Sequence, residues 1–190
     1  MENKTVYLFL ADGFEEIEAL TPADLLRRVG VPVVTVGVTG KSVTGSHGIA
    51  VTADVTADEA DRMLSDGVAP AMVILPGGMP GAKNLDESPL VERFLAAARE
   101  ADAYIAAICA APMILGKRGL LRGKAAVCYP GFEEYLTGAE LQDKGCTCAW
   151  DGKIITAQAM GAATEFALTL VEALKGESTA KELRAAILYE

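Results

Sequence analysis

Apolar residues along this chain fall into short continuous runs, and stretches with a helical spacing of apolar and polar positions lie between them. Continuous apolar runs are typical of strands covered on both faces, and an apolar residue at every third or fourth position is typical of a helix. The runs predict strands over residues 6–10, 33–36, 72–75, 104–108, 125–127 and 154–156, with a small antiparallel pair over 42–52. The helical stretches cover residues 15–29, 163–174 and 179–188, and a further helix starts at Pro89. Because Thr21-Pro22 resembles a helix start, the first stretch is either one kinked helix or a turn followed by a helix.

This alternation predicts an α/β fold in which a mostly parallel sheet is covered by helices on both faces. The chain has 190 residues and no long linker or low-complexity segment, so we expect a single domain over residues 1–190. Ligands of such sheets bind at the carboxyl ends of the strands. Candidate site residues therefore lie just after strands, over 12–18, at Gly77-Gly78 and at Cys109.

Composition and charge exclude several classes of protein. The chain has 17 Lys and Arg residues against 26 Asp and Glu, a formal net charge of −9, and no basic cluster, so we expect neither a nucleic-acid partner nor a membrane partner. The longest apolar run, over 103–115, is too short to span a bilayer, and no secretion signal opens the chain. Four cysteines without a disulfide pattern favour a reducing cytoplasm. The single histidine, His47, excludes sites that need two or three imidazoles, and we expect neither a metal nor a cofactor.

Cys109 lies where a predicted strand runs into a predicted helix. The stretch Ala106-Ala107-Ile108-Cys109-Ala110-Ala111-Pro112 matches a nucleophile elbow, a sharp turn that needs small flanking side chains. A thiol at a helix N-terminus gains thiolate stability, which lowers its pKa to roughly 3.5–7.5. The alternative is a small apolar core cysteine, because free cysteines are among the most buried residues.

Two further motifs point to the same edge of the sheet. Gly77-Gly78 follows a buried strand, and its N–H groups, with that of Ala110, could form an oxyanion hole; the alternative is an ordinary turn. Glu15-Glu16-x-Glu18 follows the first strand. A carboxyl buried beside a thiol can remain protonated and donate a hydrogen bond to the sulfur, or act as a general base next to a carbonyl. We expect Glu16, at least, to be solvated.

Together these motifs resemble the ThiJ/PfpI superfamily, and within it the branch of the parkinsonism-associated protein and its bacterial relatives. The resemblance spans nearly the whole chain and rests on five stretches: 12–18, 75–78, 81–85, 106–112 and 165–168. It implies a flavodoxin-like, doubly wound sheet and a homodimer. It also implies that Cys109 is the reactive cysteine, hydrogen-bonded to a protonated Glu18, with Gly77, Gly78 and Ala110 beside it.

The resemblance implies activities as well. In this branch the cysteine oxidises to sulfinate, and glutathione-independent glyoxalase and deglycase activities are attributed to members. The sequence departs from the pattern at Tyr129, because many relatives carry a histidine just before the proline that corresponds to Pro130. Since Ala110 replaces the histidine of the protease-like branch, and no histidine follows Cys109, we expect neither a peptidase nor an amidotransferase.

The remaining candidates have alternative roles. We expect the pocket to include Glu15, Cys128, Tyr129 and Pro130, with Cys128 as a possible second thiol for a disulfide or a metal site with Cys109. His47 is expected on the surface or at the dimer interface, with catalysis from the partner subunit as the alternative. The Cys146-x-Cys148 pair is expected in a loop before Trp150, with alternation within a strand or hairpin as the alternative.

These observations predict a cysteine-dependent stress-response protein that acts on small reactive carbonyls, as a glyoxalase or deglycase-like enzyme. Cys109 would add to an aldehyde, and Glu18 would move a proton between adjacent carbons. The alternative is a non-enzymatic redox sensor or chaperone whose Cys109 is oxidised to sulfinate. A third possibility is a dimeric binding protein without chemistry.

Overall fold

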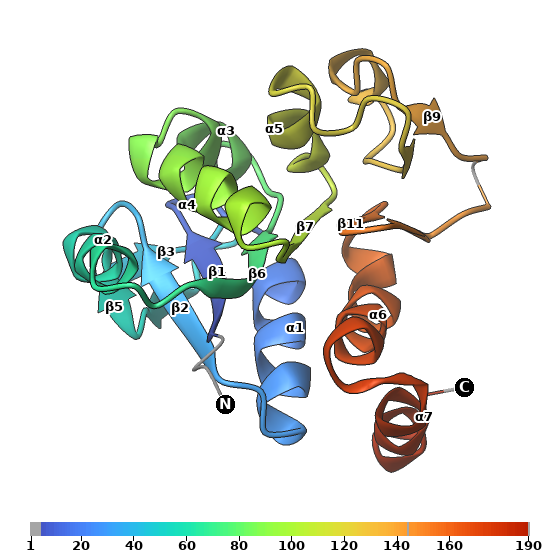
Figure 1. The fold of residues 1–190 in the computed structure, drawn as a ribbon, viewed down its shortest axis with the longest axis horizontal. Helices are drawn as coiled ribbons and strands as arrows, with labels where there is room; N and C mark the ends of the chain where they lie inside the picture. Colours follow the sequence, from blue (N-terminus) through green and yellow to red (C-terminus); the bar gives the residue numbers. More distant parts are fainter. Residues whose placement is uncertain (1–4, 144, 190) are drawn as a thin grey trace.

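The computed structural model describes residues 5–143 and 145–189, and a seven-stranded sheet forms its centre (Figure 1). The strand order is β10-β11-β7-β6-β1-β2-β5, and every pair is parallel except β10 with β11. The strands are β1 (Thr5–Leu10), β2 (Val33–Gly37), β5 (Val55–Thr56), β6 (Pro70–Leu75), β7 (Tyr104–Ile108), β10 (Cys148–Asp151) and β11 (Ile154–Ala157). The predicted strands at the centre of the sheet are therefore confirmed, and the mostly parallel arrangement with them.

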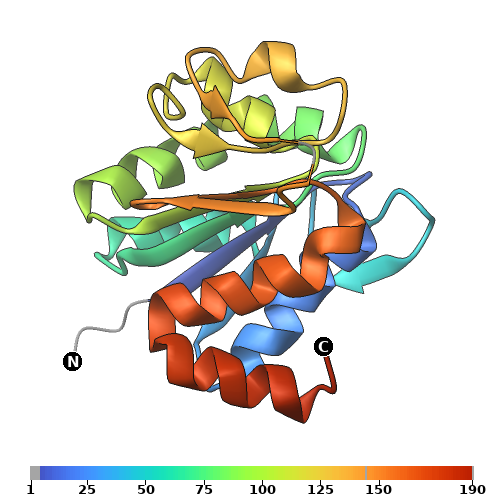
Figure 2. The same ribbon diagram turned by 90° about the vertical axis from the view of Figure 1, so that its right-hand side faces the viewer.

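Helices cover both faces of this sheet, as Figure 2 shows edge-on. One layer holds α1 (Glu16–Arg28) and α6 (Ala163–Lys175), which pack against each other, with α7 (Glu177–Ala186) against α6. The opposite layer holds α2 (Ala57–Ser65), α3 (Gly81–Asp86), α4 (Pro89–Glu100) and α5 (Pro112–Lys117). The predicted α/β, flavodoxin-like class is confirmed.

The burial of the strands explains why their sequences are continuous apolar runs. All six residues of β1 are buried, and so are the last four of β6 and of β7. Each of these strands has neighbours on both edges and helices on both faces, so the side chains on both of its faces are shielded from water. The register places Leu8 beside Ile74 and Ile74 beside Ala106, which brings the carboxyl ends of β1, β6 and β7 to one edge.

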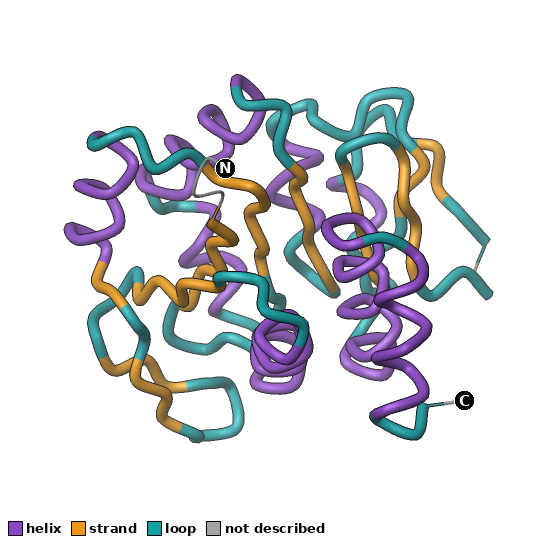
Figure 3. The backbone as a smooth tube through the Cα atoms, turned by 60° about the horizontal axis from the view of Figure 1, so that its bottom comes forward, coloured by secondary structure: helices purple, strands orange, loops and turns teal. Residues whose placement is uncertain are grey.

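Two ambiguities at the sequence level are resolved. The stretch over 15–29 is one helix, α1, with Pro22 inside it, and not a turn followed by a helix. The pair over 42–52 is the hairpin of β3 (Ser42–Thr44) and β4 (Ala50–Thr52), which projects from the body of the molecule (Figure 3).

Several short elements carry no strong hydrophobic pattern and were not predicted. Helix α2 is one, although Thr56 and Glu59 form a capping box at its start, a signal that the sequence does contain. The turns η1 (Glu133–Tyr135) and η2 (Met160–Ala162), of 3₁₀ type, and strand β9 (Glu140–Leu141) are others. The strand predicted over 125–127 is present as β8 (Ala125–Ala126), but it pairs in parallel with β9 and lies outside the central sheet. Among the described residues, no helix combines the length and the apolar character needed to cross a membrane.

Candidate active site

Cys109 directly follows β7 in the middle of the sheet and has a left-handed backbone, with φ 63°. Non-glycine residues rarely adopt this region, and they do so where the surroundings hold them there. The N–H of Cys109 donates to the carbonyl of Ala157 at 2.9 Å, and its carbonyl accepts from the N–H of Tyr129 at 2.8 Å. These bonds fix the turn, and α5 then begins at Pro112. The elbow predicted from the small flanking residues is present.

Gly77 and Glu18 complete the wall around the thiol. The N–H of Gly77 donates to Oε2 of Glu18 at 3.0 Å, and the Glu18 side chain on α1 is fully buried. A Cβ at Gly77 would lie 2.7 Å from both Cβ of Cys109 and Oε2 of Glu18. A glycine is therefore required here for the thiol and the carboxyl to approach each other.

The expected set of three N–H donors needs a correction. The N–H of Gly77 is already bonded to Glu18, so it is not free to stabilise an oxyanion. The N–H groups of Gly78 and Ala110 instead face the Cys109 sulfur and favour its thiolate. Gly78 has φ 83°, and a Cβ there would lie 2.5 Å from the backbone of Gly13 and Glu15, so the close packing of two loops requires this glycine.

Burial raises the pKa of Glu18 to about 7, although hydrogen bonds with Cys109 and from Gly77 lower it. The neighbouring Glu15 adds a smaller repulsive contribution in the raising direction. Oε1 of Glu18 is buried and has no hydrogen-bond partner of ordinary geometry. A carboxyl in this environment holds and releases a proton near neutral pH, as a general acid or base must.

The thiol behaves differently from the sequence-based expectation of a lowered pKa. Burial raises the pKa of Cys109 to about 12, and the adjacent Glu18 carboxyl raises it further than Gly78 and Ala110 lower it. Helix α5 has only six residues, so its dipole adds little against these effects. Burial therefore favours the protonated form of both groups, the thiol of Cys109 and the carboxyl of Glu18.

A cavity of about 200 Å³ opens beside this pair. Of the residues expected in the pocket, Glu15 and Tyr129 line it, and Cys128 and Pro130 do not. Cys128 is buried in the hydrophobic core, whereas Pro130 is exposed, so neither side chain faces the cavity. Residues that sequence reasoning missed complete the lining: Ser46, Met79, Phe132 and Met160.

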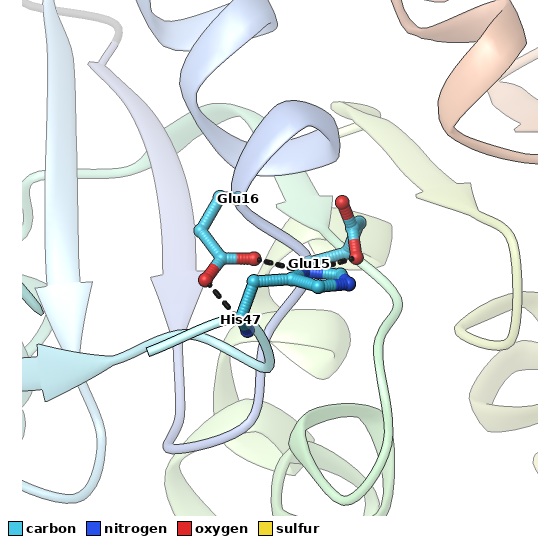
Figure 4. Close-up of side chains that lie close together, drawn as sticks. All are labelled: Glu15, Glu16 and His47. Carbon is cyan, nitrogen blue, oxygen red and sulfur yellow. Dashed lines mark hydrogen bonds and ion pairs between the residues drawn. The ribbon is translucent and has the colours of Figure 1, made fainter. Parts of the chain in front are cut away.

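The other expected residues lie at the edge of this cavity. Glu16 is buried, with 5% of its surface exposed, which corrects the expectation of a solvated side chain. Burial acts to raise the pKa of Glu16, but hydrogen bonds from His47 and from backbone N–H groups hold it at about 2. The glycine at 45 permits this arrangement, because a Cβ there would lie 2.2 Å from Oε1 of Glu16. His47 contacts Glu15 and Glu16 of its own chain, and these three residues form one group that could hold a metal ion (Figure 4).

The described structure also has a larger hollow, of about 400 Å³, between β10 and α6. It is lined by Cys148, whose sulfur lies 3.6 Å from Oγ1 of Thr169 and whose pKa burial raises to about 11. Among the described residues, neither a strained backbone nor a fully buried carboxyl lies beside this thiol, because the nearby Glu165 carboxyl is half-buried. The cavity at Cys109 is therefore the better candidate for chemistry, although the hollow at Cys148 is larger.

A doubly wound sheet, a cysteine held at a strand-to-helix elbow and a buried carboxyl beside it define a flavodoxin-like domain built around one thiol. The sequence matches the DJ-1/PfpI family over residues 4–173, and the chain belongs to this family, which confirms the resemblance. The chain is 34% identical to the Parkinson disease protein 7 homolog of Danio rerio over the full length of both proteins. It is similar to the solved structure described as Toxoplasma gondii DJ-1, oxidized, with a TM-score of 0.90, 34% identity and 98% of each chain covered. A Caenorhabditis elegans relative named glutathione-independent glyoxalase DJR-1.2 is 27% identical, with 96% of this chain and 94% of the relative covered.

Proposed function

We propose that the chain converts methylglyoxal and related small 2-oxoaldehydes to 2-hydroxy acids without glutathione. The observation that carries this proposal is the buried pair of Cys109 and Glu18 at the wall of a cavity of about 200 Å³. A cavity of this size suits a substrate of a few carbon atoms. The name of the Caenorhabditis elegans relative supports the same reaction class.

In the first step the Cys109 sulfur attacks the aldehyde carbon, and Glu18 takes the thiol proton as a general base. The carbonyl oxygen becomes the hydroxyl of a hemithioacetal by receiving a proton. The N–H groups of Gly78 and Ala110 face the reacting sulfur and favour the thiolate as it forms. A thiol with a raised pKa needs such a base, because little thiolate exists at neutral pH.

In the second step Glu18 removes the proton from the carbon that bears sulfur and returns it to the adjacent carbon through an enediol. The product is a thioester of the 2-hydroxy acid on Cys109. Water then cleaves the carbon–sulfur bond, releases the acid and restores the thiol. The reaction is an internal redox isomerisation followed by hydrolysis, so it needs no external oxidant, and Glu18 supplies the proton transfer. Deglycase-like hydrolysis would begin from the same thiol.

One observation favours a second candidate, a redox sensor or chaperone. A solved relative with a TM-score of 0.90 is described as oxidized. In this alternative one hydrogen peroxide molecule oxidises Cys109 to sulfenate and a second oxidises the sulfenate to sulfinate, and each transfers one oxygen to sulfur and is reduced to water. The burial of Cys109 and its raised pKa weigh against a fast reaction with peroxide.

We also propose a cytoplasmic homodimer as the working form. Ile17 and Leu20 on α1 and Ile49 before β4 are exposed, with 52%, 38% and 55% of their surface accessible. Exposed apolar side chains on neighbouring elements support self-association. The four free cysteines support a reducing compartment.

The test is the formation of chiral lactate from methylglyoxal by the purified protein. Lactate is the proper readout, because any thiol traps methylglyoxal reversibly. Cys109→Ser should abolish turnover, and Glu18→Gln should lower it by about 100-fold or more, the contribution of a positioned general base. Cys128→Ser is the matched control, because Cys128 is buried outside the cavity, and it should retain activity. Lactate formation that is equal in all four proteins, or absent from all four, would overturn the proposal; the second result would leave the redox alternative as the better one.

A further inference from the structure

Glu15, Glu16 and His47 bring three metal-ligating atoms together at the edge of the cavity (Figure 4). Glu15 directly precedes α1 and Glu16 begins it, whereas His47 lies on the loop between β3 and β4. Nδ1 of His47 lies 3.0 Å from Oε2 of Glu16 and 3.3 Å from Oε2 of Glu15. The ligand atoms of the three residues all lie within 4.8 Å of one another.

The Oε2 atoms of Glu15 and Glu16 share the same two hydrogen-bonding groups. Both are buried, with 6% and 5% of the residue surface exposed for Glu15 and Glu16. Their Oε2 atoms share the Nδ1 proton of His47 and the hydroxyl of Ser46, whose Oγ lies 3.2 Å from Glu15 and 3.4 Å from Glu16. Even a protonated imidazole leaves one negative charge uncompensated, and buried charge without a partner is costly.

A second observation points the same way from inside the cavity. Glu18 lines the cavity together with Glu15 and Ser46, and its buried Oε1 atom has no hydrogen-bond partner among the described residues. The cavity wall therefore carries two carboxyl groups, and one of their oxygens is unpaired within the described structure. A cation bound beside them would compensate negative charge on these groups.

The distances suit a metal ion. Zinc bonds to imidazole nitrogen and carboxylate oxygen are about 2.0–2.2 Å long, so neighbouring ligands in tetrahedral or octahedral geometry lie about 3.0–3.5 Å apart. The separations of 3.0 and 3.3 Å between Nδ1 and the two Oε2 atoms fall in that range. One nitrogen with two oxygens is a donor set for a transition metal, because calcium and magnesium prefer oxygen alone.

The ligands are also held in place by their surroundings. Oε1 of Glu16 accepts from the backbone N–H of His47 at 2.9 Å and of Ile49 at 3.4 Å, which leaves Oε2 directed at the imidazole. Outer hydrogen bonds of this kind orient the ligands of metal sites. The group lies at the rim of the cavity, because Glu15 and Ser46 line it.

We propose that Oε2 of Glu15, Oε2 of Glu16 and Nδ1 of His47 bind one divalent first-row transition-metal ion at the rim of the Cys109 cavity. The ion displaces the proton from Nδ1, and the proton leaves to solvent. This proposal departs from the sequence-based expectation of a chain without a metal. Sequence patterns for zinc look for repeated histidines and cysteines, and this site instead pairs two adjacent carboxylates with the only histidine, 31 positions away from Glu16.

The single histidine makes the test direct. Protein with isotope-labelled histidine and no affinity tag gives one imidazole in a nitrogen NMR spectrum, and that signal belongs to His47. Titration with Zn²⁺ should move the Nδ1 signal and saturate at one equivalent. A Cys109→Ser background removes the cavity thiol as a competing ligand. A Zn²⁺ titration that leaves the imidazole signal unchanged overturns the proposal, even where zinc binds elsewhere.

Variants then test the ligand set by calorimetry. His47→Gln and Glu16→Gln should each weaken Zn²⁺ binding at least tenfold, whereas Glu165→Gln, in the hollow beside α6, should leave it unchanged. Because the His47 side chain is 65% exposed, His47→Gln should fold normally even where Glu16→Gln does not. Co²⁺ gives an independent readout, because bound thiolate adds sulfur charge-transfer bands. Equal Zn²⁺ affinity in His47→Gln, or sulfur bands with Co²⁺, would overturn the site.

Discussion

Two thiols of this chain lie beside hollows, and their surroundings differ: Cys109 is buried, whereas Cys148 is half-buried. Cys109 lies at the carboxyl end of a central strand with φ 63°, next to a buried carboxyl and a cavity of about 200 Å³. Cys148 begins the edge strand β10, contacts Thr169 and lines the larger hollow of about 400 Å³. Burial raises the pKa of both thiols, to about 12 and about 11.

The comparison shows which features identify a candidate site. The volume of the hollow does not identify the candidate site, because the larger hollow lies beside Cys148. The features found at Cys109 alone of the two thiols are a backbone held in a costly conformation and a fully buried carboxyl, since the Glu165 carboxyl near Cys148 is only half-buried. Strain of this kind persists only where the surrounding structure enforces it, which makes it a stronger indication of function than a cavity.

The largest expected effect comes from filling the space between Cys109 and Glu18. The Cβ of Gly77→Ala would lie 2.7 Å from each of these side chains, so they must separate. Overpacking of this kind costs about 1–3 kcal/mol of stability, and a displacement of about 1 Å costs about 100-fold in rate. We expect folded protein with a lowered urea midpoint and strongly reduced lactate formation.

Gly161→Ala is the matched control in the other region. Gly161 lines the larger hollow, and a Cβ there would meet no described atom within 4 Å. Stability and lactate formation should stay within error of the parent protein. Equal losses in both variants would show that close packing around Cys109 has no special role.

Much of the fold could be predicted from the sequence, because central strands that are covered on both faces have sequences of unbroken apolar residues. The strands β1, β6 and β7 are of this kind, and they place Cys109 and Gly77-Gly78 at one edge. The edge of the sheet was harder to predict. Strand β10 has an exposed Trp150 and a half-buried Cys148, so it shows no continuous apolar run.

The residues of the candidate site could be predicted from the sequence, but the electrostatics of these residues could not. Glu18 and Cys109 lie together, but the pKa of Cys109 depends on how deeply the turn is buried, which no local pattern reports. The burial of Glu16 depends on a loop thirty positions along the chain, which closes over it because residue 45 is a glycine. Contacts between segments that are distant in the sequence determine both the pKa of Cys109 and the burial of Glu16.

A second prediction separates the two thiols by charge. Glu18 raises the pKa of Cys109, so Glu18→Gln should lower this pKa and increase the thiolate fraction at a fixed pH below it. Each unit of pKa corresponds to about a tenfold change in thiolate, and alkylation follows the thiolate. We expect iodoacetamide to label Cys109 about tenfold faster in the variant at pH 8, as measured by peptide mass spectrometry. Labelling of Cys148 in the same sample is the internal control and should not change. Slower labelling of Cys109 would mean that Glu18 donates a hydrogen bond to the thiolate, as the family resemblance implies.

The smallest expected effect is in the larger hollow. Cys148→Ala removes a partly buried sulfur and its contact with Thr169, which is worth about 1 kcal/mol of unfolding free energy. Urea denaturation should show this small loss, and lactate formation should be unchanged, because Cys148 lies on the edge strand away from the elbow. Cys146→Ala serves as the neighbour control, since its sulfur makes only a contact with the carbonyl of Cys148 at 3.3 Å. If Cys148→Ala folds normally but loses activity, the larger hollow takes part in the chemistry, and strain and a neighbouring carboxyl are not sufficient to locate the site.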